Sequence, residues 1–329
     1  MIIGSVSENK DIEKRISITP ELAKKYILSG FQILLEKDYG LHLGILNDNF
    51  IKAGCKIDNR ENILKQSDIL LQINLLESPV LDHLKENIIL IGNFNSIQNL
   101  ERIKKINKKK ISVFSLELLP RITRAQSMDI LSSQANLAGY KSVVDSFARF
   151  KKVIPMMMTA AGTITAAKVL VVGAGVAGLQ AIATAKRMGA IVFATDVRVS
   201  SKEQVESLGG KFLVVEGSEN LETEGGYAKE ASEEFKKKQE YLLAETLKKI
   251  DIVICTALIP GKKAPLIIKE KMIDNMQPGS VIYDLAASQG GNAAYTKIDE
   301  IVEKNGVTIL GEKNILNKIP ISASNLYAK

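Results

Sequence analysis

The sequence contains no tryptophan, two cysteines and two histidines, and only 5% of its residues are aromatic. Two cysteines this far apart exclude a small disulfide-built scaffold, and the apolar contexts of Cys55 and Cys255 predict two buried thiols. No apolar run is long enough to span a bilayer, and the mean hydropathy is only +0.05. Because the N-terminal segment lacks the apolar core and cleavage site of a signal peptide, we expect a cytoplasmic chain.

The sequence also has little that could move a proton or hold a metal. We expect His42 to lie in a surface turn and His83 in a helical linker, and neither pattern is typical of a catalytic base. The cysteines and histidines show no metal-ligand spacing, so no metal is expected, and the sequence has no nucleophile elbow. The net charge of +7 comes from scattered lysines. They lack the interleaved aromatic residues of single-strand binders, so we expect no nucleic-acid partner.

The chain does have 329 residues of globular composition, which is enough for two domains with cores of their own. The segments expected to form strands are 2–6, 31–36, 68–73, 88–94 and 111–115, and then 169–172, 191–195, 212–215, 252–256, 280–285 and 307–310. Helix-like stretches separate these strands, a pattern typical of parallel α/β folds. A helical stretch at about 127–150 predicts a connector.

We therefore predict an α/β fold with two Rossmann-like domains joined by a long connector helix. The first comprises residues 1–128 with 315–329. The second comprises residues 129–314 and forms a doubly wound parallel sheet that binds NAD. A long exposed loop at about 217–235 is expected to be mobile, since loops of that length in a compact domain are usually functional or mobile.

The segment GAGVAG directly follows an apolar strand and opens a helix of small residues. Gly173 permits a tight turn, Gly175 lets the backbone approach a pyrophosphate, and Gly178 permits close helix–strand packing. Asp196 ends the next strand, 18 residues after Gly178. Its carboxylate can accept hydrogen bonds from a ribose diol and would repel a 2′-phosphate, which favours NAD over NADP; the nearby Arg198 weakens this preference. The competing interpretation is a glycine-rich packing turn.

Several longer segments resemble one family. They are PRITRAQSMDILSSQANLAGYKSVV (120–144), IPMMMTAAGTITAAKVLVVGAGVAGLQAIATAKRMGAIVFATDVR (154–198), GGYAKE (225–230), TALIPGKKAP (256–265) and PGSVIYDLAASQGGN (278–292). Over nearly its whole length, the chain resembles the NAD(H)-binding component (domain I, alpha subunit) of the proton-translocating, Si-type NAD(P)+ transhydrogenase. The resemblance implies direct hydride transfer between NAD(H) on this chain and NADP(H) on a partner subunit. No substrate proton moves at the nicotinamide, which explains the missing acid or base.

The resemblance also implies which residues form the site. Arg121, Gln126, Asp129 and Ser132 would hold the nicotinamide end of the nucleotide, in the cleft between the domains. The residues expected to bind the rest of the cofactor are Gly173, Gly175, Val176, Ala177, Gly178, Asp196, Val197, Arg198, Gly226, Tyr227, Gln239 and Leu258. Tyr227, in the mobile loop, would close over the bound nucleotide.

The resemblance further implies partners. They are an NADP(H)-binding beta subunit, a membrane-domain subunit and a second copy of this chain, with the assembly at the cytoplasmic face of the inner membrane. Two features depart from the family pattern: Gln289 replaces the usual acidic residue before GGN, and relatives continue beyond ISASNLYAK. We therefore expect the first domain to be incomplete at its C-terminus. A truncated, inactive NAD(H)-binding remnant is the alternative function.

Alanine dehydrogenase has a related sequence and is a weaker alternative. Glu13, Arg15 and Thr19-Pro20-Glu21 match both families. The substrate lysine and catalytic histidine of the dehydrogenase correspond to about Asn74 and Asn95 here. Because neither asparagine can take up a proton at neutral pH, we expect no amino-acid oxidoreductase, and Arg15 is expected to be structural.

Overall fold

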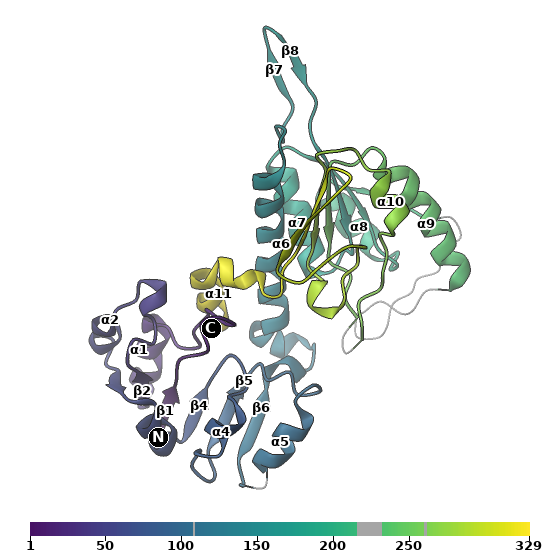
Figure 1. Cartoon of the computed structure of the whole chain (residues 1–329). Coiled ribbons are helices and arrows are strands. Elements are labelled where there is room, and N and C mark those ends of the chain that lie inside the picture. Colours follow the sequence, from purple (N-terminus) through teal and green to yellow (C-terminus); the bar gives the residue numbers. More distant parts are fainter. Residues whose placement is uncertain (108, 216–231, 260–261) are drawn as a thin grey trace. The chain divides into compact units, whose positions relative to one another are not determined.

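The computed structural model describes residues 1–107, 109–215, 232–259 and 262–329. It divides into two compact units, which we call unit 1 (Met1–Gln134 with Leu316–Lys329) and unit 2 (Ala135–Ile315). Each unit contains one main sheet flanked by helices (Figure 1). The predicted α/β fold class with two Rossmann-like sheets is therefore confirmed.

Unit 1 contains a six-stranded parallel sheet with the strand order β3-β2-β1-β4-β5-β6. Its strands are β1 (Ile2–Ser5), β2 (Gln32–Glu36), β3 (Lys56–Asp58), β4 (Ile69–Leu71), β5 (Ile89–Gly92) and β6 (Ser112–Ser115). Its helices are α1 (Pro20–Leu28), α2 (Asn47–Lys52), α3 (Arg60–Gln66), α4 (Ser78–Leu81), α5 (Leu100–Asn107) and α11 (Pro320–Tyr327). The five predicted strands are all present, and β3 is additional.

The core of unit 1 lies on both faces of this sheet. Successive strand residues point to opposite faces, so Leu34 of β2 belongs to one buried cluster while Ile33 and Leu35 belong to another. Helix α1 begins at Pro20, because the Thr19 side chain caps the backbone N–H of Leu22 and Pro20 suits the first helical position.

Unit 2 contains a seven-stranded sheet with the order β11-β10-β9-β12-β13-β15-β14. Its strands are β9 (Lys168–Val172), β10 (Ile191–Thr195), β11 (Lys211–Phe212), β12 (Ile252–Cys255), β13 (Val281–Asp284), β14 (Glu300–Lys304) and β15 (Val307–Gly311). Its helices are α7 (Val176–Arg187), α8 (Ser201–Ser207), α9 (Glu233–Leu247) and α10 (Glu270–Asp274). All strand pairs are parallel except β14–β15. The six predicted strands are present, the third shortened to β11.

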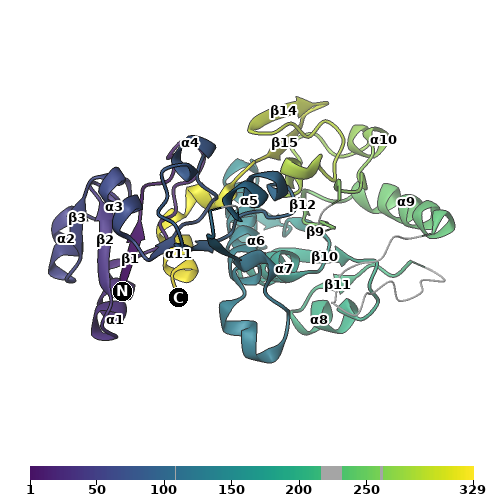
Figure 2. The same ribbon diagram turned by 90° about the horizontal axis from the view of Figure 1, so that it is seen from below.

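Helices cover both faces of the unit 2 sheet (Figures 1 and 2). Leu170 and Val172 of β9 pack in one buried cluster with Leu243 of α9 and Met272 of α10. Helix α7 contacts β9 and β10 on the other face. Parallel strands buried on both faces read as continuous apolar runs, which is why the sequence predicts them well.

The predicted connector is α6 (Ile130–Arg149), which begins in unit 1 and ends in unit 2. It is followed by a short antiparallel hairpin of β7 (Met157–Thr159) and β8 (Gly162–Ile164), which projects away from the rest of unit 2 (Figure 1). All the strand residues of this hairpin are exposed.

Both cysteines are buried, as predicted. Within the described ranges, no helix combines the length and the apolar character needed to cross a bilayer.

Candidate functional site

The glycine turn lies at the carboxyl end of β9, beside β12. At this point the strand order of the sheet reverses, and open α/β sheets bind ligands there. The turn places Gly175 at the N-cap of α7. Because the first backbone N–H groups of a helix have no acceptor within it, those of Val176 and Ala177 are available to an anionic group.

Each glycine of the motif meets a different requirement. Gly173 has φ +95°, a conformation that favours glycine. A Cβ on Gly178 would lie 1.9 Å from the carbonyl oxygen of Gly173, so only glycine lets α7 start this close to β9. Among the described residues, apart from its chain neighbours, a Cβ on Gly175 would come within 4 Å of the Arg198 guanidinium alone, at 4.0 Å. The part of the chain that the structure describes therefore leaves space over Gly175 for a ligand.

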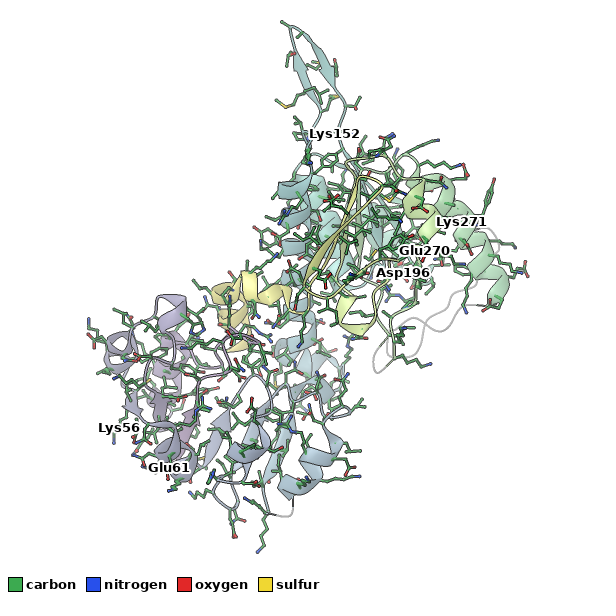
Figure 3. The ribbon with its side chains drawn as sticks, in the orientation of Figure 1. Lys56, Glu61, Lys152, Asp196, Glu270 and Lys271 are labelled. Atoms are coloured by element: carbon green, nitrogen blue, oxygen red, sulfur yellow. The ribbon has the colours of Figure 1, made fainter. Side chains whose placement is uncertain are left out.

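Asp196 follows β10 directly (Figure 3) and is tied to the glycine turn. Its Oδ2 accepts a hydrogen bond from the backbone N–H of Ala174 at 2.6 Å. Its Oδ1 accepts from the backbone N–H of Arg198 at 2.8 Å. The Arg198 guanidinium adds a two-point contact, with Nε 2.9 Å from Oδ1 and NH2 2.8 Å from Oδ2. The Asp196 side chain is 6% exposed.

These four donors use the four lone-pair positions of a carboxylate. Two of the four donors belong to the Arg198 guanidinium, and only these can swing away, so the Arg198 side chain would have to move before a ribose diol could bond to Asp196. The sequence placed Arg198 near the site but gave no sign of this pairing.

The residues expected at the nicotinamide end lie in the first turn of α6 and in the segment that precedes it. Asp129 immediately precedes this helix, and its carboxylate accepts from the backbone N–H of Ser132 at 2.9 Å and from its hydroxyl at 2.6 Å. Partial burial raises the pKa of Asp129, but the bonds from Ser132 and the nearby charge of Arg121 outweigh burial and leave the pKa lowered. Asp129 thus caps α6 as an anion. Arg121 and Gln126 are exposed in the preceding segment.

The remaining expected contacts lie on several parts of unit 2, and some lie outside the described residues. Val197 lies between Asp196 and Arg198, and Gln239 is half-buried on α9. Leu258 is 41% exposed, three residues after β12. Gly226 and Tyr227 lie outside the described residues, as does most of the loop predicted at 217–235. The end of that range is helical, because α9 begins at Glu233.

Two polar residues beside the turn were not predicted. Thr256 follows β12 and donates its hydroxyl to the carbonyl oxygen of Gly173 at 2.8 Å. Asn292 binds the backbone of the next residue, Ala257, through its side-chain amide. A polar residue directly after a strand at the reversal point of the sheet was the available signal for Thr256. The GGN motif was noted in the sequence without a role for its asparagine.

Unit 1 carries a buried charged network at the ends of its own strands. Glu13 and Arg15 form a two-point ion pair, with Arg15 NH2 2.7 Å from Glu13 Oε2 and Nε 2.8 Å from Oε1. Arg15 NH1 also donates to Gln134 at 2.9 Å. Asn74 donates its side-chain amide to Glu8 and Glu13. The arginine is therefore held by the chain's own carboxylate, as a structural role requires.

Two family models cover almost all of the chain. The alanine dehydrogenase/PNT N-terminal domain matches residues 4–138, and the alanine dehydrogenase/PNT C-terminal domain matches residues 142–329.

Named relatives separate the two branches of this family. The chain is 47% identical over 336 residues to an NAD(P) transhydrogenase subunit alpha protein of Rickettsia prowazekii, covering 100% of this chain and 87% of that protein. A crystal structure of transhydrogenase from Sinorhizobium meliloti matches with a TM-score of 0.90 and 42% identity, over 100% of this chain and 90% of that one. The alanine dehydrogenase of Methanococcus maripaludis is 26% identical, over 89% of this chain and 74% of that protein.

The similarity to transhydrogenase alpha subunits supports a transhydrogenase component that binds a nicotinamide nucleotide, and the chain belongs to the alanine dehydrogenase/PNT family.

Proposed function

We propose that this chain is the NAD(H)-binding component of a proton-translocating transhydrogenase. In this proposal, a hydride passes directly between NAD(H) on this chain and NADP(H) on a partner subunit. The enzyme is active only when the partner subunits are present, because each component supplies one of the two reacting nucleotides.

The observation that carries the proposal is the carboxylate of Asp196 beside the open glycine turn. The N–H groups at the start of α7 suit a pyrophosphate, and Gly175 leaves the space that its backbone approach requires. Once the Arg198 side chain has moved away, Asp196 can accept hydrogen bonds from both hydroxyls of an adenosine ribose. A 2′-phosphate would instead bring negative charge against this carboxylate. The residues present therefore fit NAD(H) better than NADP(H).

The nicotinamide supplies the hydride acceptor or donor, and the protein needs only to place it. Gln126 offers an amide that can bond the nicotinamide carboxamide. Ser132 and Asp129 at the start of α6 offer fixed polar groups, and Arg121 adds a positive charge near Asp129. Holding two reacting carbons in contact can by itself remove about 7–11 kcal/mol of a barrier. No proton has to move for this step, which suits a site without a histidine.

A second copy of this chain is the proposed partner for the β7–β8 hairpin. Met157 is 44% exposed, Met158 78% and Ile164 43%, and the hairpin projects from its own unit. A projecting apolar arm of this kind is typical of an interface. We expect Met158→Lys to shift the chain toward monomer in sedimentation equilibrium, whereas Lys211→Met elsewhere on unit 2 leaves its mass unchanged. An unaltered dimer in Met158→Lys, or a monomeric wild type, would contradict this assignment.

The NADP(H)-binding beta subunit and a membrane-domain subunit complete the proposed assembly at the cytoplasmic face of the inner membrane. The test is reconstitution. The chain is mixed with the NADP(H)-binding component of a related transhydrogenase, NADPH and an oxidised NAD analogue, and reduction of the analogue is followed by absorbance. Rapid reduction that requires both proteins supports the proposal. NADH binding without reduction would instead identify an inactive NAD(H)-binding remnant.

A further inference from the structure

Asn292 lies at the end of a chain of hydrogen bonds that leads to the glycine turn. Asn292 is fully buried, with an exposed fraction of 0%. Its side-chain Oδ1 accepts from the backbone N–H of Ala257 at 3.0 Å, and its Nδ2 donates to the Ala257 carbonyl at 2.8 Å. The same Nδ2 donates to the carbonyl of Pro265 at 2.9 Å. One side chain therefore fixes the peptide groups on both sides of Ala257.

Ala257 is held between two residues of the site. On one side, the Thr256 hydroxyl donates to Gly173, and a Cβ on Gly173 would lie 2.7 Å from that hydroxyl oxygen. Thr256 thus forms the floor of the glycine turn. On the other side is Leu258, which is exposed at the same edge of the sheet.

Asp284 in turn holds Asn292 in place. Asp284 is the last residue of β13 and is 0% exposed. Its Oδ2 accepts from the backbone N–H groups of Asn292 at 2.7 Å and Ala293 at 3.0 Å, and from the Thr296 hydroxyl at 2.8 Å. Its Oδ1 accepts from the backbone N–H of Ala286 at 2.9 Å. The buried carboxylate thereby shapes the turn that presents the asparagine.

We propose that Asn292, held by Asp284, is a positioning residue of the nucleotide site, which sets the affinity for NAD(H) by fixing Thr256 under the glycine turn and Leu258 beside it. The inference rests on the proposed NAD(H) binding. It adds Asn292 and Asp284 to the residues that shape the site, although neither is expected to contact the nucleotide. Asn292→Ala removes the side chain that binds three partly buried backbone groups, the N–H and carbonyl of Ala257 and the carbonyl of Pro265, and partly buried polar groups that lose a partner are costly. The peptide at Ala257 then rearranges, and the floor of the glycine turn moves with it.

The test separates positioning from general stability. Asn292→Ala is compared with Ile309→Ala, which opens a cavity in the core of the same sheet. NADH affinity is measured by nucleotide fluorescence well below both unfolding midpoints. We expect Asn292→Ala to weaken NADH binding about tenfold. Ile309→Ala is expected to change it less than about twofold at a similar loss of Tm. In the reconstituted reaction, Asn292→Ala should raise KM for the nucleotide and leave kcat unchanged.

A milder variant keeps the test decisive if Asn292→Ala does not fold. Thr296→Val removes one donor from Asp284, and we expect it to weaken NADH binding by about threefold. Unchanged affinity in the folded variants, or equal losses in Asn292→Ala and Ile309→Ala, would overturn the inference alone. A wild-type chain that does not bind NADH would overturn the proposed function together with it.

Discussion

In unit 1, the carboxyl ends of β1 and β4 lead into polar residues that form hydrogen bonds and an ion pair with one another. In unit 2, the carboxyl end of β9 leads into a glycine turn. Both places are points where the order of a parallel sheet reverses. In unit 1, Glu8 accepts from the backbone N–H groups of Ile73 and Asn74, and Arg15 is held by Glu13. In unit 2, α7 has no side-chain cap from the described residues, so its first backbone donors remain available to a ligand.

The difference shows that topology offers a crevice but side chains decide its use. A buried arginine that already holds a carboxylate gains little by exchanging it for a small acid from solution. At the corresponding place in unit 2, the glycine turn leaves backbone N–H groups available to a ligand. The edge of unit 1 is therefore closed by its own side chains, whereas the corresponding edge of unit 2 is the proposed binding edge. The following variants test this contrast.

The largest effect is expected from opening the network of unit 1. Arg15→Ala removes the guanidinium that balances the buried Glu13 carboxylate, which we expect to cost about 3–5 kcal/mol of the stability of unit 1. Hydrogen exchange of the β1 and β4 amides measures this, and NADH affinity should stay unchanged. Lys25→Ala removes an exposed ion pair with Glu21 and is the control, with little expected loss. Protection that survives in Arg15→Ala would show that the edge is not closed by this pair.

The next largest effect separates two glycines of the binding edge. Gly178→Ala forces a Cβ against the backbone oxygen of Gly173 and is expected to cost about 3 kcal/mol in thermal unfolding. In Gly175→Ala, the nearest atom to the new Cβ among the described residues, apart from its chain neighbours, lies 4.0 Å away. This variant should keep its Tm and still lose NADH affinity, because the added methyl group fills space meant for the ligand. Gly175→Ala with wild-type affinity would place the nucleotide elsewhere.

The choice between NADH and NADPH is expected to depend on Asp196. Asp196→Ala should weaken NADH binding by about thirtyfold, since the ribose loses its acceptor, and NADPH binding much less. Fluorescence titration with both nucleotides measures the ratio. Asp251→Ala is the matched control. Asp251 also accepts a hydrogen bond from a backbone N–H, that of Lys168, but it lies at the amino ends of β9 and β12, away from the glycine turn. Equal losses for NADH and NADPH in Asp196→Ala would reject the role.

The smallest effect is expected at Gln126, where binding and chemistry should separate. Gln126→Asn shortens the side chain by one methylene and should slow hydride transfer about tenfold with little change in NADH affinity. Single-turnover kinetics with the partner component measure the rate, and Thr123→Val in the same exposed segment is the control. A large loss of affinity with an unchanged rate at saturation would assign Gln126 to binding alone.

The buried parts of the fold could be predicted from the sequence, and the exposed strands could not. Strands such as β9 and β12 are continuous apolar runs buried on both faces. Strand β3 lies at a sheet edge with the polar sequence KID, and β14 is the charged edge strand EIVEK, so neither shows a burial pattern. The β7–β8 hairpin is exposed throughout, and its strands are absent from the strands expected from the sequence.

The candidate site also combines residues that could be predicted from the sequence with contacts that could not. Glycine spacing and a carboxylate at the end of the next strand are local signals, so GAGVAG and Asp196 could be found directly. The contact of Asn292 with Ala257 joins residues 35 apart in the chain. The pairing of Asp196 with Arg198 depends on side-chain rotamers. Neither contact leaves a periodic or local pattern in the sequence, so only the structure reveals them.

Direct hydride transfer is the central claim, and isotope tracing tests it most directly. NADPH carrying deuterium at the transferable C4 position is mixed with NAD+, this chain and the NADP(H)-binding component in ordinary water, and the NADH formed is analysed by mass spectrometry. The account predicts that the deuterium appears quantitatively in NADH, since no proton of the solvent enters the step. NADH without deuterium, or no NADH at all, would contradict it.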